Sequence, residues 1–379
     1  MERDRGRNTR FGDIGGLVQV VRRTFRTLDI AWDRGDGKGW FAVRNSLSVA
    51  GRAFRSASIT CRLAGLAAER RVNDASLTQP VVRNYTWSPA QRANPVTQIE
   101  HISDTAKWVA VYRAMETKRP DAIFRDPFTE RLAGEKGQAI VDGMKSGRAM
   151  AWAMIVRTAV FDEVILERVR NGNADVVLNL AAGLDARPWR MRLPTTLRWI
   201  DVDHAGILDH KTDVMKNEKP VCQYESIRLD LADVPRRQAL FSQIDAESSR
   251  VLVVSEGLVI YLKPEDVASL ARDLHGARHF QWWLFDLASP RLLALMQKMW
   301  GRSVREGNAP FQFGPAESTD FFRPFGWEER EYHPAMDDAQ RLHRQMKFMW
   351  FWRFLGRLRS RQTQEEFRRF SGTVLLERM

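Results

Sequence analysis

Cysteine is almost absent from this sequence. Its 379 residues include only Cys61 and Cys222. Two cysteines cannot build the disulfide framework of a small secreted domain or a cysteine-based metal cluster. We therefore expect the chain to fold in a reducing, cytoplasmic compartment.

Long hydrophobic runs are also missing. No apolar stretch approaches the roughly 18–20 residues that a membrane-spanning helix needs. The opening residues, MERDRGRNTRFGDIGG, lack the apolar core of a secretory signal peptide. We therefore expect no transmembrane segment and no secretory signal.

Positive charge is concentrated in the N-terminal quarter. The net charge is +12, and residues 1–100 hold 17 Lys and Arg against 9 Asp and Glu, whereas residues 101–379 hold 42 against 38. Three interpretations of the Arg-rich residues 1–95 stay open: a disordered leader, upstream sequence included by a misassigned start, or a basic arm for anionic partners. We predict that 96–379 is the main domain, for which nucleic acid is not an expected partner.

From residue 101 the apolar residues recur at regular spacings. Helical periodicity predicts helices over 103–120 and 150–173, with a short helix after the turn at Asp126-Pro127. Strand-like runs follow at 175–181, 197–203, 224–230, the first half of 250–262, 279–288, 326–333 and 372–379. This alternation predicts an α/β fold with a doubly wound, mostly parallel, seven-stranded Rossmann-like sheet and an antiparallel C-terminal edge.

Acidic residues recur just past the ends of successive predicted strands. Ligands of open α/β sheets bind at the carboxyl ends of the strands. A single acid there more often caps the next helix, but four in register favour a ligand site. The residues at these ends are Ala182, Gly183, Asp185, Asp201, Asp203, His204, Asp230, Leu231, Ser255, Glu256, Gly257, Asp286 and Ser289.

The turn after the first strand, within VVLNLAAGLDARPWR, lacks the G-x-G-x-x-G pattern of a dinucleotide site. Its single glycine, Gly183, is followed by Asp185, whose charge opposes a phosphate and suits a cationic amine. An acid at the end of the second strand fits ribose hydroxyls. Asp230 and Leu231 fit an adenine, as an acceptor for its amine and an apolar wall. Amine, ribose and adenine without phosphate describe S-adenosylmethionine, the cofactor that we predict.

Several blocks occur in one order along the chain: SDTAKWVAVYRAMETKRPDAIFRDPFTERLAG, NLAAGLDARPWRM, LRWIDVDHAGILDHK, SEGLVIYL and GTVLLER. In this order they resemble the class I S-adenosylmethionine-dependent methyltransferases of the leucine carboxyl methyltransferase-like family. The nearest branch is the bacterial small-molecule O-methyltransferases. The resemblance covers about residues 101–379 and does not extend to residues 1–95.

The resemblance implies residues for the methionyl part of the cofactor. Lys107 and Arg157 would neutralise its carboxylate, Gly183 would pass beneath it, and Glu256 would lie near its amino group or sulfonium. Ala181 replaces the first glycine of the turn G-A-G-x-D-T that is frequent in the family. We expect this alanine to be tolerated with a negative φ angle.

The resemblance also implies residues for the nucleoside part. Asp203 would bind the ribose hydroxyls, and Asp230 and Leu231 would hold the adenine. In WIDVDHAG, Asp201 stands where the family usually has Glu, and His204 is unusual for the family.

The implied activity is O-methylation of a carboxylate or hydroxyl group on a small molecule. Two alternatives stay open: a protein C-terminal carboxyl methyltransferase, and a non-catalytic cofactor-binding protein. The catalytic residues are unknown, His204 and Tyr261 being candidate bases by position only, and the histidine spacing predicts no metal site. We expect the helices before the first strand and the Met-, Trp- and Phe-rich insertion 290–325 to form the acceptor pocket, and 346–361 to form a helix on the sheet.

Overall fold

The computed structural model describes residues 104–143, 147–306, 310–345 and 360–379. The predictions for residues 1–95 lie outside the described residues, as does nearly all of the helix predicted over 346–361. Within the described ranges, no helix combines the length and the hydrophobicity that crossing a lipid bilayer requires.

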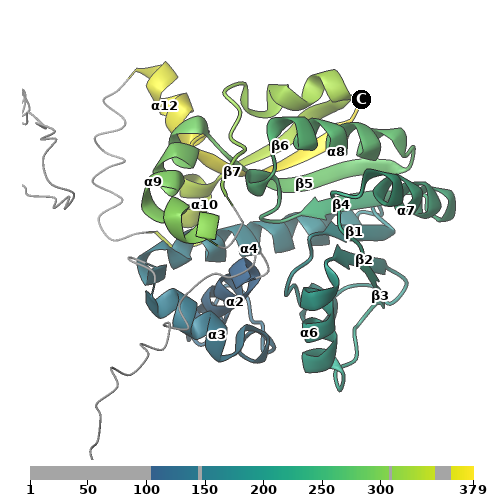
Figure 1. Ribbon diagram of the computed structural model, residues 1–379, viewed down its shortest axis with the longest axis horizontal. Coiled ribbons are helices and arrows are strands. Elements are labelled where there is room, and N and C mark those ends of the chain that lie inside the picture. The colour runs from purple at the N-terminus through teal and green to yellow at the C-terminus, as the bar shows by residue number, and fades with distance from the viewer. Residues whose placement is uncertain (1–103, 144–146, 307–309, 346–359) are drawn as a thin grey trace, which may run out of the picture. The chain divides into compact units, whose positions relative to one another are not determined.

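A seven-stranded sheet forms the centre of the described part (Figure 1). Its strands are β1 (Val176–Leu180), β2 (Arg198–Asp203), β3 (Gln223–Arg228), β4 (Val251–Ser255), β5 (Phe280–Ala288), β6 (Trp327–Pro334) and β7 (Ser371–Arg378). They lie in the order β3-β2-β1-β4-β5-β7-β6. The strands β1 to β5 are parallel, and β7 is antiparallel to both β5 and β6. The predicted fold class and its antiparallel edge are confirmed.

Helices connect and cover these strands. They are α2 (Asp104–Thr117), α3 (Thr129–Gly143), α4 (Gly147–Arg170), α5 (Arg187–Arg190), α6 (Ala205–Met215), α7 (Val234–Glu247), α8 (Pro264–Gly276), α9 (Pro290–Glu306), α10 (Ala335–Arg341) and α12 (Arg361–Arg368), with the 3-10 helices η1 (Val259–Tyr261) and η2 (Ser318–Phe325). The helices predicted over 103–120 and 150–173 are confirmed as α2 and α4. The helix α3 is longer than predicted because it consists of two helical segments joined by a kink at Gly134, whose φ of +59° is not helical.

The central strands are covered on both faces. Along β1, Val176, Leu178 and Leu180 pack into a core that α7 and α8 share, while Val177 packs into a second core that α4 shares. This division follows from the strand geometry, in which successive side chains point to opposite faces. Parallel strands buried on both faces need continuous apolar runs, which explains the sequences VVLNL and VLVVS.

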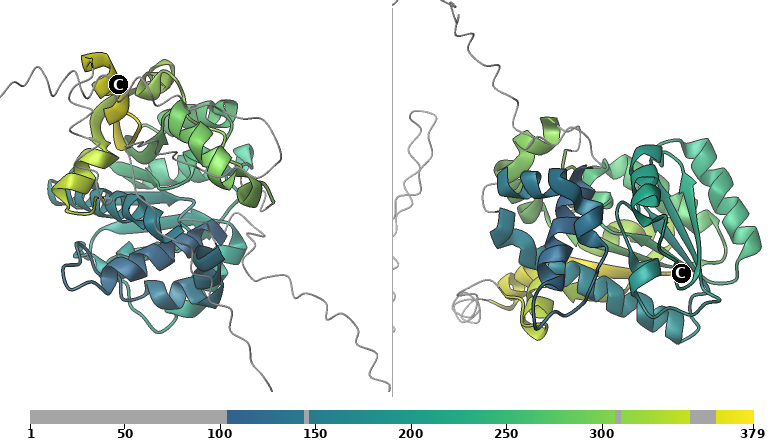
Figure 2. Two further views of the ribbon diagram at one scale, coloured as in Figure 1. Left: turned by 90° about the vertical axis from the view of Figure 1, so that its left-hand side faces the viewer. Right: turned by 90° about the horizontal axis from the view of Figure 1, so that it is seen from below.

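A helical layer lies at one end of the sheet. The helices α2 and α3, in blue, lie together there in Figures 1 and 2. Their core includes Leu184, Ile207, Ile260 and Ala288, which follow or end β1, β2, β4 and β5. The layer therefore closes over the carboxyl ends of the strands.

Candidate active site

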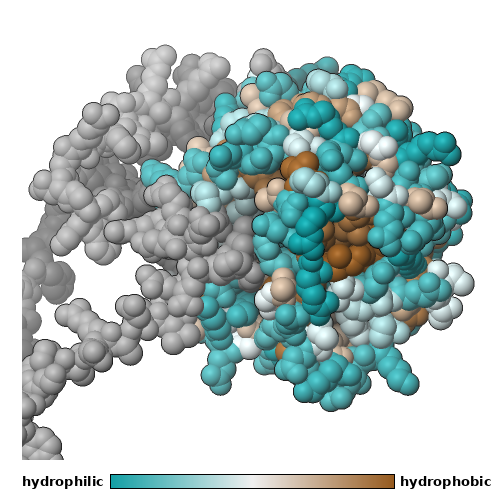
Figure 3. Space-filling view, turned by 45° about the vertical axis from the view of Figure 1, so that its right-hand side comes forward, coloured by the Kyte–Doolittle hydropathy of each residue, from teal (hydrophilic) through white to brown (hydrophobic). Residues whose placement is uncertain are grey.

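A cavity of about 430 Å³ lies at the carboxyl ends of β1, β2, β4 and β5, with α2, α4 and α9 completing its wall. Figure 3 shows an apolar hollow bordered by hydrophilic side chains on one face of the molecule. Seven of the eight residues predicted to bind the cofactor line the cavity: Arg157, Ala181, Gly183, Asp203, Asp230, Leu231 and Glu256. The cavity therefore lies at the sheet edge where the strand-end acids predicted a ligand site.

The turn after β1 is more strained than the sequence predicted. Ala181 has a φ angle of +52° and Gly183 one of +51°. The expectation of a negative φ at Ala181 is wrong. The chain turns away from β1 while the Ala182 N–H still bonds the Val202 carbonyl at 3.2 Å, and this geometry takes Ala181 into the left-handed region. A Cβ at Gly183 would lie 3.1 Å from the Cβ of Ala106, so the close approach of α2 also favours glycine there.

Asp203 joins the carboxyl ends of β1 and β2. Its Oδ2 accepts the Gly183 N–H at 2.7 Å, and its Oδ1 accepts the His204 N–H at 2.7 Å. Burial raises the pKa of Asp203, although both N–H groups favour the ionised form and oppose this rise. The acid predicted for ribose binding therefore also fixes the first turn.

Asp230 and Leu231 follow β3, as predicted. Asp230 is exposed at the cavity, and its Oδ1 accepts the Ala232 N–H at 2.9 Å. Leu231 is half-buried and packs against the apolar core that contains Leu229 and Leu258. A carboxylate beside an apolar wall is thus present at the end of β3.

Asp185 lines the cavity, but the protein already engages its carboxylate. Its Oδ2 accepts Nη1 of Arg187 at 2.7 Å and Nδ2 of Asn179 at 3.2 Å, and its Oδ1 accepts the Arg187 N–H at 2.8 Å. Burial disfavours the ionised form, but the charges of Arg187 and Lys211 outweigh it and hold the pKa of Asp185 well below its usual range. The expectation that Asp185 serves a cationic amine is therefore corrected, because this carboxylate serves Arg187.

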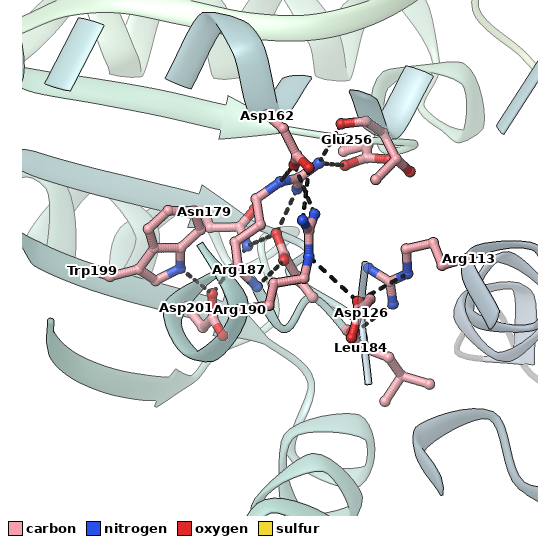
Figure 4. Close-up of polar contacts among 12 residues, drawn as sticks. Arg113, Asp126, Asp162, Asn179, Leu184, Arg187, Arg190, Trp199, Asp201 and Glu256 are labelled. Carbon is pink, nitrogen blue, oxygen red and sulfur yellow. Dashed lines mark hydrogen bonds and ion pairs between the residues drawn. The ribbon is translucent and has the colours of Figure 1, made fainter. Parts of the chain in front are cut away.

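Arg187 is the centre of the buried ion-pair network in Figure 4. Its Nε donates to Asp162 at 2.7 Å, and its Nη2 lies 2.8 Å from Oε2 of Glu256. Asp162 also accepts from Arg190 at 2.7 Å, and Arg190 Nε lies 3.4 Å from Asp126. Buried charges persist only when paired, so the network fixes α4, the turn after β1 and the end of β4 relative to one another.

Arg157 and Glu256 form a second part of this network. Arg157 Nε donates to Oε1 of Glu256 at 3.0 Å, and its Nη1 lies 3.2 Å from Oδ2 of Asp286. Burial disfavours the charge of Arg157, but Asp286 and Glu256 outweigh it and raise the pKa of the guanidinium. Burial opposes ionisation of Glu256 too, but Arg187 and Arg157 keep its pKa below the usual range. Arg157 and Glu256 are therefore both ionised at neutral pH.

A family model described as leucine carboxyl methyltransferase matches residues 106–275. The matched range contains the strands β1 to β4 and the strand-end acids at the cavity. Residues 106–275 are thus similar to the leucine carboxyl methyltransferase family.

Relatives of the chain carry corresponding names. Two of them are proteins of Streptomyces coelicolor and Frankia alni, each provisionally named an S-adenosyl-L-methionine-dependent methyltransferase. Each is 34% identical to this chain, over 177 and 178 residues respectively. The aligned residues cover 44% of this chain and 61% of each relative. A Mycobacterium avium protein with the same name is 31% identical over 195 residues, covering 48% of this chain and 60% of its own. This chain thus spans about three fifths of the length of these curated relatives.

Among solved structures, the crystal structure of a duf574 family protein from Streptomyces avermitilis has a TM-score of 0.46 and 12% identity to this chain. It covers 75% of this chain and 100% of its own. At this level of similarity the comparison adds nothing about the site.

Lys107 does not line the cavity. The resemblance to methyltransferases implied that Lys107 and Arg157 would bind the cofactor carboxylate. The Nζ of Lys107 lies 3.5 Å from Oδ1 of Asp104. Helical spacing explains the difference, because side chains three and four residues apart share a face. The face of α2 that lines the cavity consists of Thr105, Ala106, Trp108, Val109, Tyr112 and Arg113.

Part of the cavity wall is apolar. The helices before β1 and the insertion 290–325, the segments expected to form the acceptor pocket, supply this wall. Its residues lie on α2, α4 and α9, apart from Phe311, which lies beyond α9: they are Trp108, Tyr112, Met150, Met154, Leu292, Met296 and Phe311. The insertion 290–325 contributes the last three. The contribution of α4 was not predicted residue by residue, because this helix is apolar on several faces and its cavity face has no distinct sequence pattern.

The two candidate bases also line the cavity. Burial raises the pKa of Tyr261 to about 12, and its phenol hydrogen-bonds the side chain of Thr105. Burial likewise raises the pKa of Tyr112 to about 12. Both phenols are therefore neutral near pH 7 and suited to hydrogen bonding. His204 lies directly before α6, on the same side as Asp203.

Acidic side chains outnumber basic ones at the cavity. Over the described ranges, the basic lining side chains with permanent charge are Arg113, Arg157 and Arg237, and the carboxylates are Asp185, Asp203, Asp230, Glu256, Asp266 and Asp286. Over the same ranges, no three His, Cys, Asp or Glu side chains are grouped so that they could hold a metal ion.

Proposed function

We propose that this protein is an S-adenosylmethionine-dependent methyltransferase that O-methylates a carboxylate or hydroxyl group of a small molecule. The observation that carries the proposal is the cavity at the carboxyl ends of the strands, where Asp203 fixes a single-glycine turn. A carboxylate at this turn opposes the phosphates of a dinucleotide and accepts hydrogen bonds from ribose hydroxyls.

The charge of the lining supports this cofactor. S-adenosylmethionine carries a sulfonium, an ammonium and a carboxylate, and so is a cation overall. Asp203 and Asp230, whose carboxylates accept backbone N–H groups, attract such a ligand and repel a nucleotide phosphate. Asp203 would bind the ribose, and Asp230 with Leu231 would bind the adenine. Arg157 would bind the methionyl carboxylate, close to Glu256.

When bound, the cofactor supplies an electrophilic methyl group, which bonds to an acceptor oxygen as its bond to sulfur breaks and S-adenosylhomocysteine forms. The residues of the chain supply position and a dry environment. The apolar wall of Met154, Met296 and Phe311 excludes water from the acceptor side. A carboxylate acceptor needs no proton transfer, whereas a hydroxyl acceptor releases one proton.

The acceptor side favours a small molecule with an apolar body. Methionine side chains adapt to irregular shapes, and aromatic rings give a large contact area. The neutral phenols of Tyr112 and Tyr261 can donate hydrogen bonds to an acceptor oxygen. These features support a lipophilic carboxylic acid or phenol as the substrate.

Calorimetric titration tests the proposed function. We expect S-adenosylmethionine and S-adenosylhomocysteine to bind the wild-type protein, and Asp203→Ala to weaken both by about 100-fold, since it removes a charged hydrogen-bond acceptor. Glu163→Gln is the control, because Glu163 lies on α4 in an exposed ion pair with Arg341, outside the cavity. Folded wild-type protein that binds neither ligand would exclude the proposed function.

A further inference from the structure

The strand β5 carries an acid that the cofactor contacts above do not use. Its sequence, FQWWLFDLA, is apolar apart from Gln281 and Asp286. Asp286 lies near the carboxyl end of β5 and its side chain lines the cavity. An acid kept in a largely buried strand needs specific partners.

Asp286 has a partner for each carboxylate oxygen. Its Oδ1 accepts the Gly257 N–H at 2.5 Å, and its Oδ2 lies 3.2 Å from Nη1 of Arg157. These contacts join three separate segments: β5, the turn after β4, and the helix α4. Asp286 therefore holds the guanidinium of Arg157 against the turn that follows Glu256.

The turn itself is shaped around this guanidinium. Gly257 has a φ angle of +70°, and a Cβ built there would lie 3.3 Å from Nη1 of Arg157. A side chain at position 257 would thus strain the backbone and press on the guanidinium. The glycine allows the backbone N–H and the guanidinium to approach the same carboxylate.

Glu256 fixes the opposite edge of the guanidinium. It accepts from Arg157 Nε at 3.0 Å and is itself held by Arg187 at 2.8 Å. Glu256 therefore accepts the Nε–H of Arg157, and Asp286 accepts one N–H of its Nη1. A guanidinium has five N–H donors, so this arrangement orients Arg157 while leaving donors for a ligand carboxylate.

We infer that Asp286 is a positioning residue, which holds Arg157 in the orientation that binds the carboxylate of the cofactor's methionyl part. This inference rests on the proposed function. Asp286 acts through Arg157, and its removal would weaken only ligands that carry this carboxylate. A residue that contacted the cofactor's amino group, or that merely maintained the fold, would show a different ligand dependence.

Three ligands separate these possibilities in titrations of wild type and Asp286→Asn. S-adenosylhomocysteine has both the carboxylate and the amine, S-adenosyl-3-thiopropylamine has only the amine, and 5′-methylthioadenosine has neither. We expect the variant to bind the first ligand about 10- to 100-fold more weakly, as for a lost charge-assisted contact. The second should change by at most about threefold, from the loss of one screened charge, and the third should not change.

A double-variant cycle with Arg157→Ala provides a second measurement. Asp286→Asn should have little further effect on S-adenosylhomocysteine binding once Arg157 is removed, because the two residues act as one unit. Glu163→Gln, on the same helix as Arg157, is the matched control and should leave all three affinities unchanged.

The inference is overturned if Asp286→Asn leaves S-adenosylhomocysteine binding unchanged. Equal weakening of S-adenosyl-3-thiopropylamine would assign Asp286 to the amino group instead, and weakening of 5′-methylthioadenosine would assign it to the fold. Wild-type protein that binds none of the three ligands would exclude the proposed function itself, which is a separate result.

Discussion

Ala181 is a single residue under backbone strain at the edge of the cavity. Its φ angle of +52° lies in the left-handed region, which costs an L-residue about 1–2 kcal/mol. The same turn offers the backbone N–H of Gly183 to Asp203, so the strain lies where the cofactor is proposed to pass.

Ala181→Gly should raise the free energy of unfolding by about 0.5–1 kcal/mol, because relief of the left-handed strain exceeds the added entropy of the unfolded chain. Urea denaturation of both proteins measures the difference. Ala182→Gly is the matched control: Ala182 is not among the residues with positive φ, so this variant should be less stable than wild type. A less stable Ala181→Gly would contradict the strain argument.

Several secondary-structure elements meet at Arg187. Its guanidinium binds Asp162 on α4, Asp185 in the turn after β1, and Glu256 at the end of β4. With about 1% of its own side chain exposed, it neutralises three carboxylates that are themselves mostly buried. The elements around the cavity are thus fixed by one cation.

Arg187→Met keeps much of the side-chain volume but leaves these carboxylates without their shared partner. We expect the variant to lose about 3–5 kcal/mol of unfolding free energy, the usual cost of breaking a buried ion pair. Chemical denaturation followed by circular dichroism gives the value. Glu163→Gln is the control: it removes the exposed pair with Arg341, which keeps its pair with Asp338, and should cost less than about 1 kcal/mol. Similar losses in the two variants would show that the buried network does not stabilise the fold.

The largely buried carboxylates of Asp185 and Glu256 make the free energy of unfolding of the whole domain depend on pH. The folded-state pKa values of Asp185 and Glu256 lie below their ordinary values of about 4. A lowered carboxyl pKa contributes stability that is complete above the unfolded-state pKa and is lost as the pH falls through the folded-state pKa. The raised pKa of Asp203 acts in the opposite direction and offsets part of this effect.

We therefore expect the unfolding free energy to change little between about pH 7 and pH 5 and to fall below about pH 4. Urea denaturation at constant ionic strength across this range measures the curve. Asp185→Asn should be less stable at neutral pH and should lose less on acidification, because it lacks one of the titrating groups. A curve for Asp185→Asn that runs parallel to the wild-type curve would exclude Asp185 as a source of the pH dependence.

The sequence by itself determined the fold class and the sheet edge at which the cavity lies. Continuous apolar runs such as VVLNL specify strands buried on both faces, and parallel strands bring their carboxyl ends to one edge. The strand-end residues Asp203, Asp230 and Glu256 could therefore be assigned to one site before their distances were known. Local pattern and sheet geometry were enough for this assignment.

Only the tertiary structure decided which charges serve a ligand and which serve the protein. The sequence predicted that Asp185 suits a cationic amine, yet Asp185 and Arg187 are buried and paired with each other because α4 and the end of β4 close around them. The link from Asp286 to Arg157 spans 129 residues, and the left-handed angle of Ala181 accompanies the bond from the Ala182 N–H to Val202 on β2. Burial, ion pairing and backbone strain arise from contacts between distant segments, so no local sequence pattern encodes them.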